Sequence, residues 1–367
     1  MADLSLFQGG GEVPVGGVVS FAENLPDEII LNDGSAFIRN DNLILSGFNT
    51  TRFGVNGFFE QLWSTVNADL DFQFVRDVTE GANGVLCAVS NFGLISRSTD
   101  NGVTWTQVLN DPNFTNCEAM AYGNGTFIAA GTSGNCVRSI DNGLNWIVNV
   151  PLSISALSIG YGNGVWIAAG RNAGGRRSTD DGVSWANVSI GIVDDNADPR
   201  ATITDGSGTW VISSNNTTVV ARSTNDGLTW AGVTTPNSGG TLRGQAANGT
   251  FIIGCNGSKV LRSGDSGVTW SVIDAPLDAA INDFSKVATD GSGNWLGVAS
   301  NGLGFSKSTD DGLTWTFNGL NPPINCNTVT YHSSKAWLAP RANGLIYTTR
   351  ISVGVVGLTS FDYMRYV

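Results

Sequence analysis

Histidine is almost absent from this sequence, with His332 the single copy among 367 residues. One histidine cannot form the cluster that holds a transition metal, although a calcium site built from carboxylates stays possible. Long apolar runs are missing too, and the N-terminus lacks the basic and apolar regions of a signal peptide. We therefore expect no membrane insertion, and a protein made in the cytoplasm that is not exported by the ordinary signal route.

Cysteine and charge are also sparse. The five cysteines show no C-x-x-C spacing, and their odd number argues against a disulfide framework, so we predict buried thiols. Only 14% of residues are charged, and 31 acidic against 19 basic residues give a net charge of −12. A chain this acidic lacks the positive field that attracts phosphates, so nucleic acid is not an expected partner. The cysteines are Cys87, Cys117, Cys136, Cys255 and Cys326.

The sequence is rich in glycine, with 48 residues. It also contains six copies of one eight-residue phrase. Successive tryptophans of this phrase are 41, 39, 45, 40 and 45 residues apart. A period near forty indicates stacked or radial units, none of which can bury its apolar face alone. The copies are STDNGVTW from Ser98, SIDNGLNW from Ser139, STDDGVSW from Ser178, STNDGLTW from Ser223, SGDSGVTW from Ser263 and STDDGLTW from Ser308.

Each period predicts four short strands joined by three turns. Within the phrase, Asp or Asn, a small polar residue and then Gly supply the left-handed backbone of a tight hairpin. Upstream, segments such as NGTFIAAG place a glycine-bounded turn before an apolar strand headed by Phe or Trp. No stretch shows the 3.6-residue periodicity of an amphipathic helix, so we expect an all-β fold.

The phrase S-x-D-x-G-x-T-W resembles the Asp-box, or bacterial neuraminidase repeat, of sialidase-like and photosystem II assembly factor-like β-propellers. The resemblance covers about four-fifths of the chain. It implies that the Asp position stabilises its turn and does not bind ligand. One copy departs from the pattern with Asn225, which should weaken only that turn. The six positions are Asp100, Asp141, Asp180, Asn225, Asp265 and Asp310.

Counting periods predicts a seven-bladed β-propeller over residues 58–350. Six periods are complete, and a seventh, beginning near residue 325, supplies three strands but no eight-residue phrase. Residues 58–66 contain Trp63, 42 residues before Trp105 and therefore in step with the other tryptophans. We predict that this N-terminal strand pairs with Leu345–Arg350 and closes the ring, which removes the free sheet edges.

The two chain ends, residues 1–57 and 351–367, are predicted to form a small β module beside the propeller. Part of it resembles the start of phage tail-collar and tail-fibre modules, although Asp27 and Glu28 replace the usual Gly-Trp. The resemblance implies attachment to other virion proteins. The matching residues are Pro14, Val15, Gly16, Val18, Phe21, Asp33, Gly34 and Ser35.

Sialidase chemistry would need three arginines around the substrate carboxylate, a Tyr–Glu pair and an acidic residue. Tyr122 and Tyr161 occupy matching points of a repeated YGNG turn, which marks them as structural. Five arginines each precede the serine of a phrase, so periodicity assigns them to the scaffold. We therefore expect no catalytic residues and no cofactor. The arginines are Arg97, Arg138, Arg177, Arg222 and Arg262.

Candidate binding residues are polar side chains that break the repeat near the start of each first strand, opposite the repeated turns. The alternative is that any propeller channel has a polar, wet mouth. We predict no metal site, and the acidic residues Asp194, Asp195 and Asp198 form either a calcium loop or a solvated one. The candidates are Arg76, Asp77, Glu118, Arg200, Arg243, Asp283, Lys286 and Asn327.

The resemblance to tail-collar modules, together with the missing catalytic motifs, implies a non-enzymatic phage virion component, of tail-fibre or spike type, that binds the host cell surface. Cationic candidates in an acidic chain favour a surface glycan as ligand, and the terminal module would bind other virion or tail proteins. An oligomer is possible. Two alternatives stay open: a glycoside hydrolase acting on surface polysaccharide, and an assembly-factor-like scaffold that binds proteins.

Overall fold

The computed structural model divides the chain into two compact units, Thr65–Thr349 and a unit of Met1–Ser64 with Arg350–Val367. In the second of these, β1 (Arg39–Asn40) pairs antiparallel with β2 (Leu43–Ile44). The residues that resemble a tail-collar module, and Cys326 and Trp63, lie outside the described part. The structure describes residues 39–40, 43–44, 64–67, 75–114, 116–171, 174–191, 198–215, 217–236, 240–277, 283–299, 304–319, 328–331, 336–340 and 345–350.

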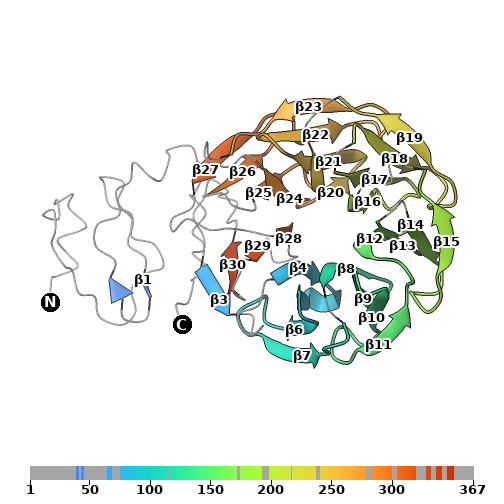
Figure 1. The fold of residues 1–367 in the computed structure, drawn as a ribbon. Coiled ribbons are helices and arrows are strands. Elements are labelled where there is room, and N and C mark those ends of the chain that lie inside the picture. The colour runs from blue at the N-terminus through green and yellow to red at the C-terminus, as the bar shows by residue number, and fades with distance from the viewer. Residues whose placement is uncertain are drawn as a thin grey trace, which may run out of the picture. The chain divides into compact units, whose positions relative to one another are not determined.

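Seven blades of four antiparallel strands each surround a common centre, so the predicted seven-bladed β-propeller is confirmed (Figure 1). We number the blades along the chain, from blade 1 (β4–β7) to blade 6 (β24–β27). Blade 7 consists of β28, β29, β30 and the N-terminal strand β3. The first strand of each blade lies nearest the centre. These strands are β4 (Val75–Glu80), β8 (Cys117–Gly123), β12 (Ala156–Gly162), β16 (Pro199–Thr204), β20 (Thr241–Ala247), β24 (Phe284–Thr289) and β28 (Thr330–Tyr331).

The second strands are the most apolar segments and form the core between neighbouring sheets. In β9, for example, all six residues are buried. Trp166, Trp210 and Trp295 are completely buried at this level, as expected for tryptophans that pack between sheets. The second strands are β5 (Leu86–Ser90), β9 (Thr126–Gly131), β13 (Val165–Gly170), β17 (Trp210–Ser214), β21 (Thr250–Cys255), β25 (Trp295–Ala299) and β29 (Ala336–Pro340).

The third and fourth strands form an outer hairpin in each blade. The fourth strands lie at the outside of the ring (Figure 1) and expose much of their surface, as in β15. The third strands are β6 (Leu94–Ser98), β10 (Asn135–Ser139), β14 (Gly174–Ser178), β18 (Val219–Ser223), β22 (Lys259–Ser263), β26 (Gly304–Ser308) and β30 (Leu345–Arg350). The fourth strands are β7 (Thr106–Asn110), β11 (Ile147–Pro151), β15 (Ala186–Ser189), β19 (Ala231–Thr234), β23 (Ser271–Asp274), β27 (Thr316–Gly319) and β3 (Ser64–Asn67).

Blade 7 joins the two ends of the propeller. Its strand order is β28-β29-β30-β3, so an N-terminal strand completes the C-terminal sheet, as predicted. The described strand begins at Ser64, inside the predicted segment 58–66. With β3 in place every blade has four strands, and the outer side of β30 is paired.

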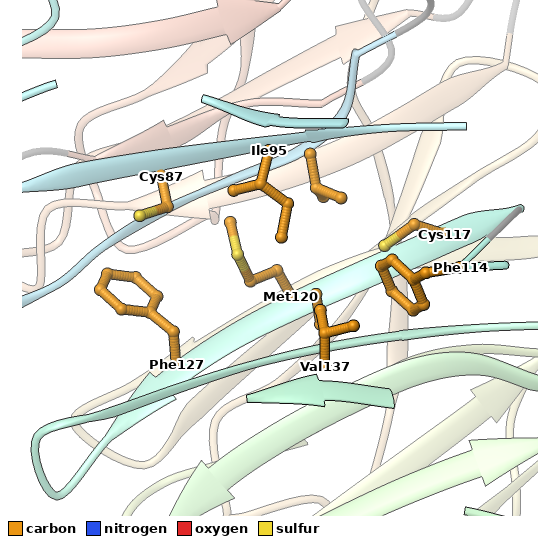
Figure 2. Close-up of a cluster of buried hydrophobic side chains, with 9 residues drawn as sticks. Cys87, Ile95, Phe114, Cys117, Met120, Phe127 and Val137 are labelled. Carbon is orange, nitrogen blue, oxygen red and sulfur yellow. The ribbon is translucent and has the colours of Figure 1, made fainter. Parts of the chain in front are cut away.

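Apolar side chains from neighbouring blades interlock between the sheets. Figure 2 shows one such cluster, in which Phe127 and Met120 of blade 2 face Cys87 and Ile95 of blade 1. Cys87, Cys117, Cys136 and Cys255 are all buried and free, which confirms that prediction for the four described cysteines. The single helical element among the described residues is a short 3-10 turn, Ala82–Gly84, and no helix there could span a membrane.

The repeated phrase forms the turn between the third and fourth strands, and its side chains hold the turn internally. In blade 1, Ser98 Oγ donates to Asp100 Oδ1 at 2.8 Å and accepts the N–H of Gly102 at 2.9 Å. The Asp100 carboxylate in turn accepts the N–H of Thr104 at 2.8 Å. The indole N–H of Trp105 donates to the carbonyl oxygen of Gly102 at 3.0 Å, which fixes the start of the fourth strand.

Asn225 keeps this arrangement in blade 4. Its Oδ1 accepts the hydroxyl of Ser223 and the N–H of Thr229, at 2.9 and 3.0 Å. Its amide nitrogen donates to Thr229 Oγ1 at 2.8 Å, whereas Asp100 in blade 1 accepts the hydroxyl of Thr104 at the same place. The exchange reverses one hydrogen bond and removes none, so the expected local weakening is not visible in the contacts of this turn.

The arginine that precedes five of the six phrases binds the turn of the next blade, as expected for a scaffold residue. In each case the Nε–H donates to the backbone carbonyl of the left-handed residue before the turn glycine, such as Asp226, whose φ is 55°. A charged donor makes this a strong contact between blades. The pairs are Arg97 with Asn142 (2.9 Å), Arg138 with Asp181 (2.5 Å), Arg177 with Asp226, Arg222 with Ser266 and Arg262 with Asp311 (each 2.7 Å).

The turn glycine is required for two reasons. Gly182 has a φ of 78°, which side chains disfavour. In addition, a Cβ at this position would lie 2.2 Å from Cδ1 of Ile128 in the preceding blade. Gly312 meets Ile252 in the same way at 2.1 Å. Each turn therefore packs directly on the second strand of its neighbour.

Replacing Arg177 by methionine should lower the free energy of unfolding by about 2 kcal/mol, because it removes a charged hydrogen bond between blades 3 and 4 while keeping an apolar stem. The matched control is Arg176→Met, one residue away, whose guanidinium binds carbonyls of its own blade and of the nearby Ser153 at the surface. Urea unfolding measures both. Equal losses for the two variants would contradict the inter-blade role.

The turns also predict an acid-dependent stability. Hydrogen bonds from the hydroxyl and N–H of Thr269 lower the pKa of Asp265 from 3.8 to about 2. Such a group stabilises the fold above its unfolded pKa, and the contribution is lost as the pH falls through its folded pKa. Because Asp265 is exposed, the effect is on the order of a few tenths of a kcal/mol. The stability of Asp265→Asn should therefore fall less than that of the parent between pH 5 and pH 2. Urea unfolding at both pH values tests this, and identical losses would refute it.

Candidate functional site

Most first strands change register near their beginning, and this irregularity orients the candidate side chains. A β-bulge adds a residue to one strand and re-aims its side chain. In β4 the added residue is Arg76, in β8 it is Glu118 and in β16 it is Arg200. The shifts lie between Val75 and Asp77, Cys117 and Ala119, Ala156 and Ser158, Pro199 and Ala201, Thr241 and Gly244, and Phe284 and Lys286. We call this end of the first strands the bulge face.

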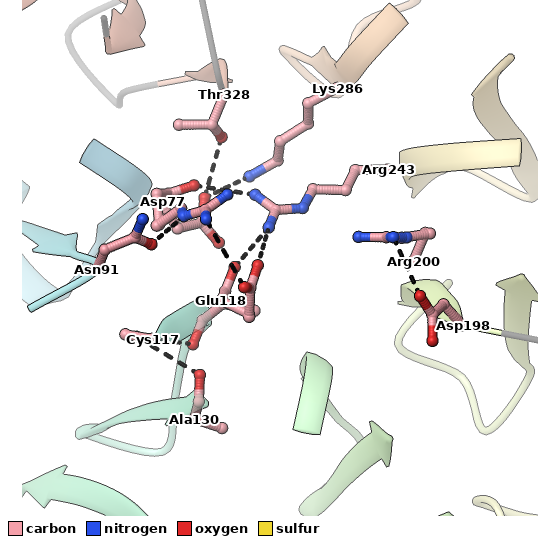
Figure 3. A network of polar contacts seen from close by, with 12 residues as sticks. Asp77, Asn91, Cys117, Glu118, Ala130, Asp198, Arg200, Arg243, Lys286 and Thr328 are labelled. Carbon is pink, nitrogen blue, oxygen red and sulfur yellow. Dashed lines mark hydrogen bonds and ion pairs between the residues drawn. The ribbon is translucent and has the colours of Figure 1, made fainter. Parts of the chain in front are cut away.

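Asp77 is the centre of a polar network on the bulge face (Figure 3). Its Oδ1 accepts Lys286 Nζ of blade 6 at 2.8 Å and the hydroxyl of Thr328, next to β28 of blade 7, at 3.0 Å. Its Oδ2 accepts the N–H of Met120 of blade 2 at 3.2 Å. One buried carboxylate of blade 1 thus contacts three other blades.

The charge of Asp77 is stabilised by its neighbours. Burial by itself would raise the pKa of this carboxyl group, but the positive charges of Lys286 and Arg243, with hydrogen bonds from Lys286 and the Met120 N–H, outweigh burial and lower it. Asp77 is therefore an anion at neutral pH, with a structural cation beside it.

Arg243 of blade 5 reaches across the ring. Its two terminal nitrogens donate to the backbone carbonyls of Arg76 in blade 1, at 2.9 Å, and Glu118 in blade 2, at 2.5 Å. The backbone of β20 also pairs with that of β24 in parallel, with Arg243 opposite Lys286. Blades 5 and 6 therefore form one eight-stranded sheet. These contacts cross the centre, so Arg243 contributes to ring closure.

Arg76 and Glu118 complete the network. A terminal nitrogen of Arg76 lies 3.8 Å from one Glu118 oxygen, and Arg243 lies 3.7 Å from the other. The Arg76 Nε–H donates to Asn91 Oδ1. With Lys286 and Asp77, three cations face two carboxylates, which leaves one positive charge in excess. The Arg76 side chain is 35% exposed, so this excess is accessible to solvent.

Arg200 belongs to a second, separate group on blades 3 and 4, apart from Asp77 and Glu118 in Figure 3. Asp198 pairs with Arg200 at 3.2 Å and with Arg171 at 3.4 Å. The side chains of Arg200 and Arg171 are 33% and 57% exposed. Among the residues that the structure describes here, two cations share one carboxylate, which leaves one positive charge in excess.

The remaining candidates have other surroundings. Asp283 accepts the N–H of Gly257 at 3.3 Å and is not part of either group. Asn327, Asp194 and Asp195 lie outside the described residues. Asp198 uses both oxygens for arginines, and no set of three His, Cys, Asp or Glu that could hold a metal occurs in the described part of the chain.

Sequence reasoning missed Asn91, Thr328 and Arg171, which hold members of the two groups. Asn91 and Arg171 follow second strands, in loops whose composition varies between blades, so periodicity gave no signal for them. Shallow hollows of about 180 Å³ lie elsewhere, on the outer hairpins of blades 1 and 4. They are lined by equivalent positions such as Arg97 and Arg222, so the hollows follow from the shape of the repeat.

The Asp77–Lys286 pair should be a large source of stability. Lys286→Met leaves Asp77 buried without its nearest counter-ion and should lower the free energy of unfolding by about 3 kcal/mol. The double variant Asp77→Asn with Lys286→Met should recover at least half of that loss, because a neutral amide needs no counter-ion. Urea unfolding measures both variants. A double variant less stable than Lys286→Met would contradict the pairing.

No protein-family model matches this sequence, and no curated protein is significantly similar to it. Solved β-propellers are similar in fold. YCF48 bound to D1 peptide is 16% identical with a TM-score of 0.62, over 79% of this chain and 95% of that one. Virginiamycin B lyase from Staphylococcus aureus is 13% identical with a TM-score of 0.68, over 80% and 100%. The WD40 propeller domain of Doa1 is 12% identical with a TM-score of 0.63, over 80% and 98%. At these identities the likeness establishes the propeller fold alone.

Proposed function

We propose that this chain is a non-enzymatic binding protein whose propeller docks an acidic segment of a partner protein on the bulge face. The observation that carries the proposal is the excess of one positive charge in each of the two described groups, where Arg76 and Arg200 are partly exposed and Arg171 is exposed, in a chain with a net charge of −12. A local positive surface on an acidic molecule selects anionic groups and repels other surfaces of similar charge.

The carboxylates favour binding over hydrolysis. A glycosidase needs a carboxylic acid whose pKa is raised, so that it can donate a proton near neutral pH. Among the described aspartates and glutamates, every pKa that departs clearly from its usual value is lowered. On the bulge face, Asp77, Glu118 and Asp198 are paired with cations, whereas Asp283 accepts the N–H of Gly257. The lowered carboxyl groups are Asp77, Asp100, Asp141, Asp180, Asp265, Asp290 and Asp310.

A bound peptide in a propeller of similar fold favours a protein segment over a sugar. The similar propeller YCF48 has a peptide bound, which supports an assembly-factor-like scaffold as the closer model. Because Arg243 crosses the centre, the partner would lie on the bulge face and would not thread through the ring.

A second candidate is host-surface binding by a phage virion component, with a glycan as ligand. The resemblance of Pro14, Val15 and Gly16 and the residues after them to tail-collar modules favours it. In that case the terminal unit would attach to other virion proteins and leave the propeller to contact the host. The exposed cations would then bind an anionic surface glycan.

The test is binding of a fluorescein-labelled hexaglutamate peptide, with a hexaglutamine peptide as the uncharged control. We expect hexaglutamate to bind, binding to weaken with salt, and the double variant Arg171→Gln with Arg200→Gln to lose at least fivefold in affinity. Arg176→Gln removes a cation from the third strand of blade 3 and should have little effect. Equal binding by parent and double variant would overturn the proposal. Binding of oligosialic acid without binding of hexaglutamate would favour the glycan candidate.

A further inference from the structure

Phe92 is an aromatic side chain presented on the bulge face. It lies in the three-residue turn between β5 and β6, and it is 54% exposed. Ser90, two residues earlier, pairs with Val75 at the start of β4, which places this turn at the same end of blade 1 as Arg76. The corresponding turns of blades 2 and 5 have Ser133 and Gly257 at the same place. The turn itself therefore does not require an aromatic residue.

The turn that carries Phe92 is tightly fixed. Gly93 has a φ of 77°, and a Cβ on it would lie 2.2 Å from the carbonyl oxygen of Asp111. The N–H of Asp111 donates to the Gly93 carbonyl at 3.3 Å, and the N–H of Asn116 donates to the Asn91 carbonyl at 2.6 Å. An exposed ring on a fixed turn loses little conformational entropy when it is covered, which favours binding.

The same turn is bonded to the accessible cation of the main network. Asn91, directly before Phe92, accepts the Nε–H of Arg76 through its side-chain oxygen. Blade 1 thus presents an aromatic ring and a partly exposed guanidinium on adjoining segments. Neither group is required by the repeated structure. Arg76 is the added residue of a bulge, and the position of Phe92 holds a small residue in blades 2 and 5.

We propose that Phe92 and Arg76 form a two-part subsite for a protein segment in which an apolar side chain stands next to a carboxylate. This inference rests on the proposed function and names the partner's chemistry at that site. Arg76 would pair with the carboxylate, while the neighbouring apolar side chain covers the Phe92 ring. Burial of both apolar surfaces adds affinity that charge alone does not supply.

The experiment compares two labelled peptides, Glu-Glu-Leu-Glu-Glu and Glu-Glu-Ser-Glu-Glu, binding to the full chain. We expect the leucine peptide to bind about tenfold more tightly. Phe92→Ser should abolish this preference and leave the affinity for the serine peptide unchanged. Serine occupies the equivalent place in blade 2, so the variant is expected to fold, which its melting temperature checks. Phe317→Ser, at a second exposed phenylalanine on β27, is the matched control and should keep the preference.

Each other result overturns the inference in a distinguishable way. If hexaglutamate and both peptides fail to bind, the proposed function falls and this subsite with it. If hexaglutamate binds but leucine gives no gain, or if Phe92→Ser keeps the gain, only the subsite is wrong. If Phe92→Ser instead weakens oligosialic acid binding and leaves the peptide preference intact, the ring contacts a sugar and the peptide assignment is wrong.

Discussion

Contact between one repeated turn and the preceding blade is the constraint on which the propeller depends. The turn exposes the carbonyl of a left-handed residue, and an arginine of the preceding blade binds it, as Arg177 binds Asp226. The turn glycine lies against the same blade, where any side chain would meet Ile167 or its equivalent. The Ser and Asp of the phrase hold the turn in this shape. The phrase therefore recurs because each blade must fit the next one.

This constraint separates the two faces of the ring. Repeated turns at one end fix the spacing and tilt of the blades, so their residues are committed to packing. At the opposite end the first strands begin with bulges, and their side chains vary from Arg76 to Glu118 to Arg200. A rigid repeated scaffold with one variable end is the usual basis of a binding surface in repeat folds.

Periodicity made the strands and turns predictable, because they recur in each blade. It also made the closing strand predictable, because the last repeat has three strands and lacks the fourth. It also identified the polar positions at the starts of the first strands. It could not show that Arg243 spans the ring to Arg76 and Glu118, since such contacts join residues that are 167 and 125 positions apart. The bulges were equally hidden, because one added residue leaves no mark in a pattern of short strands. Phe92 gave no signal in the sequence, because it lies in a turn outside the repeated phrase and its exposure depends on the fold.

The bulge face has two kinds of cation. Some are mostly buried and stabilise the fold, and others are partly exposed and are not needed to neutralise a carboxylate. Lys286 and Arg243 are mostly buried and are needed to hold Asp77 ionised and to join blades across the centre. Arg76 exceeds that need, as does one of the two arginines that share Asp198. A partly exposed cation that is not needed to neutralise a nearby carboxylate adds little to the free energy of unfolding. Such a cation keeps the ability to attract an anion from solvent, which the mostly buried Lys286 and Arg243 lack.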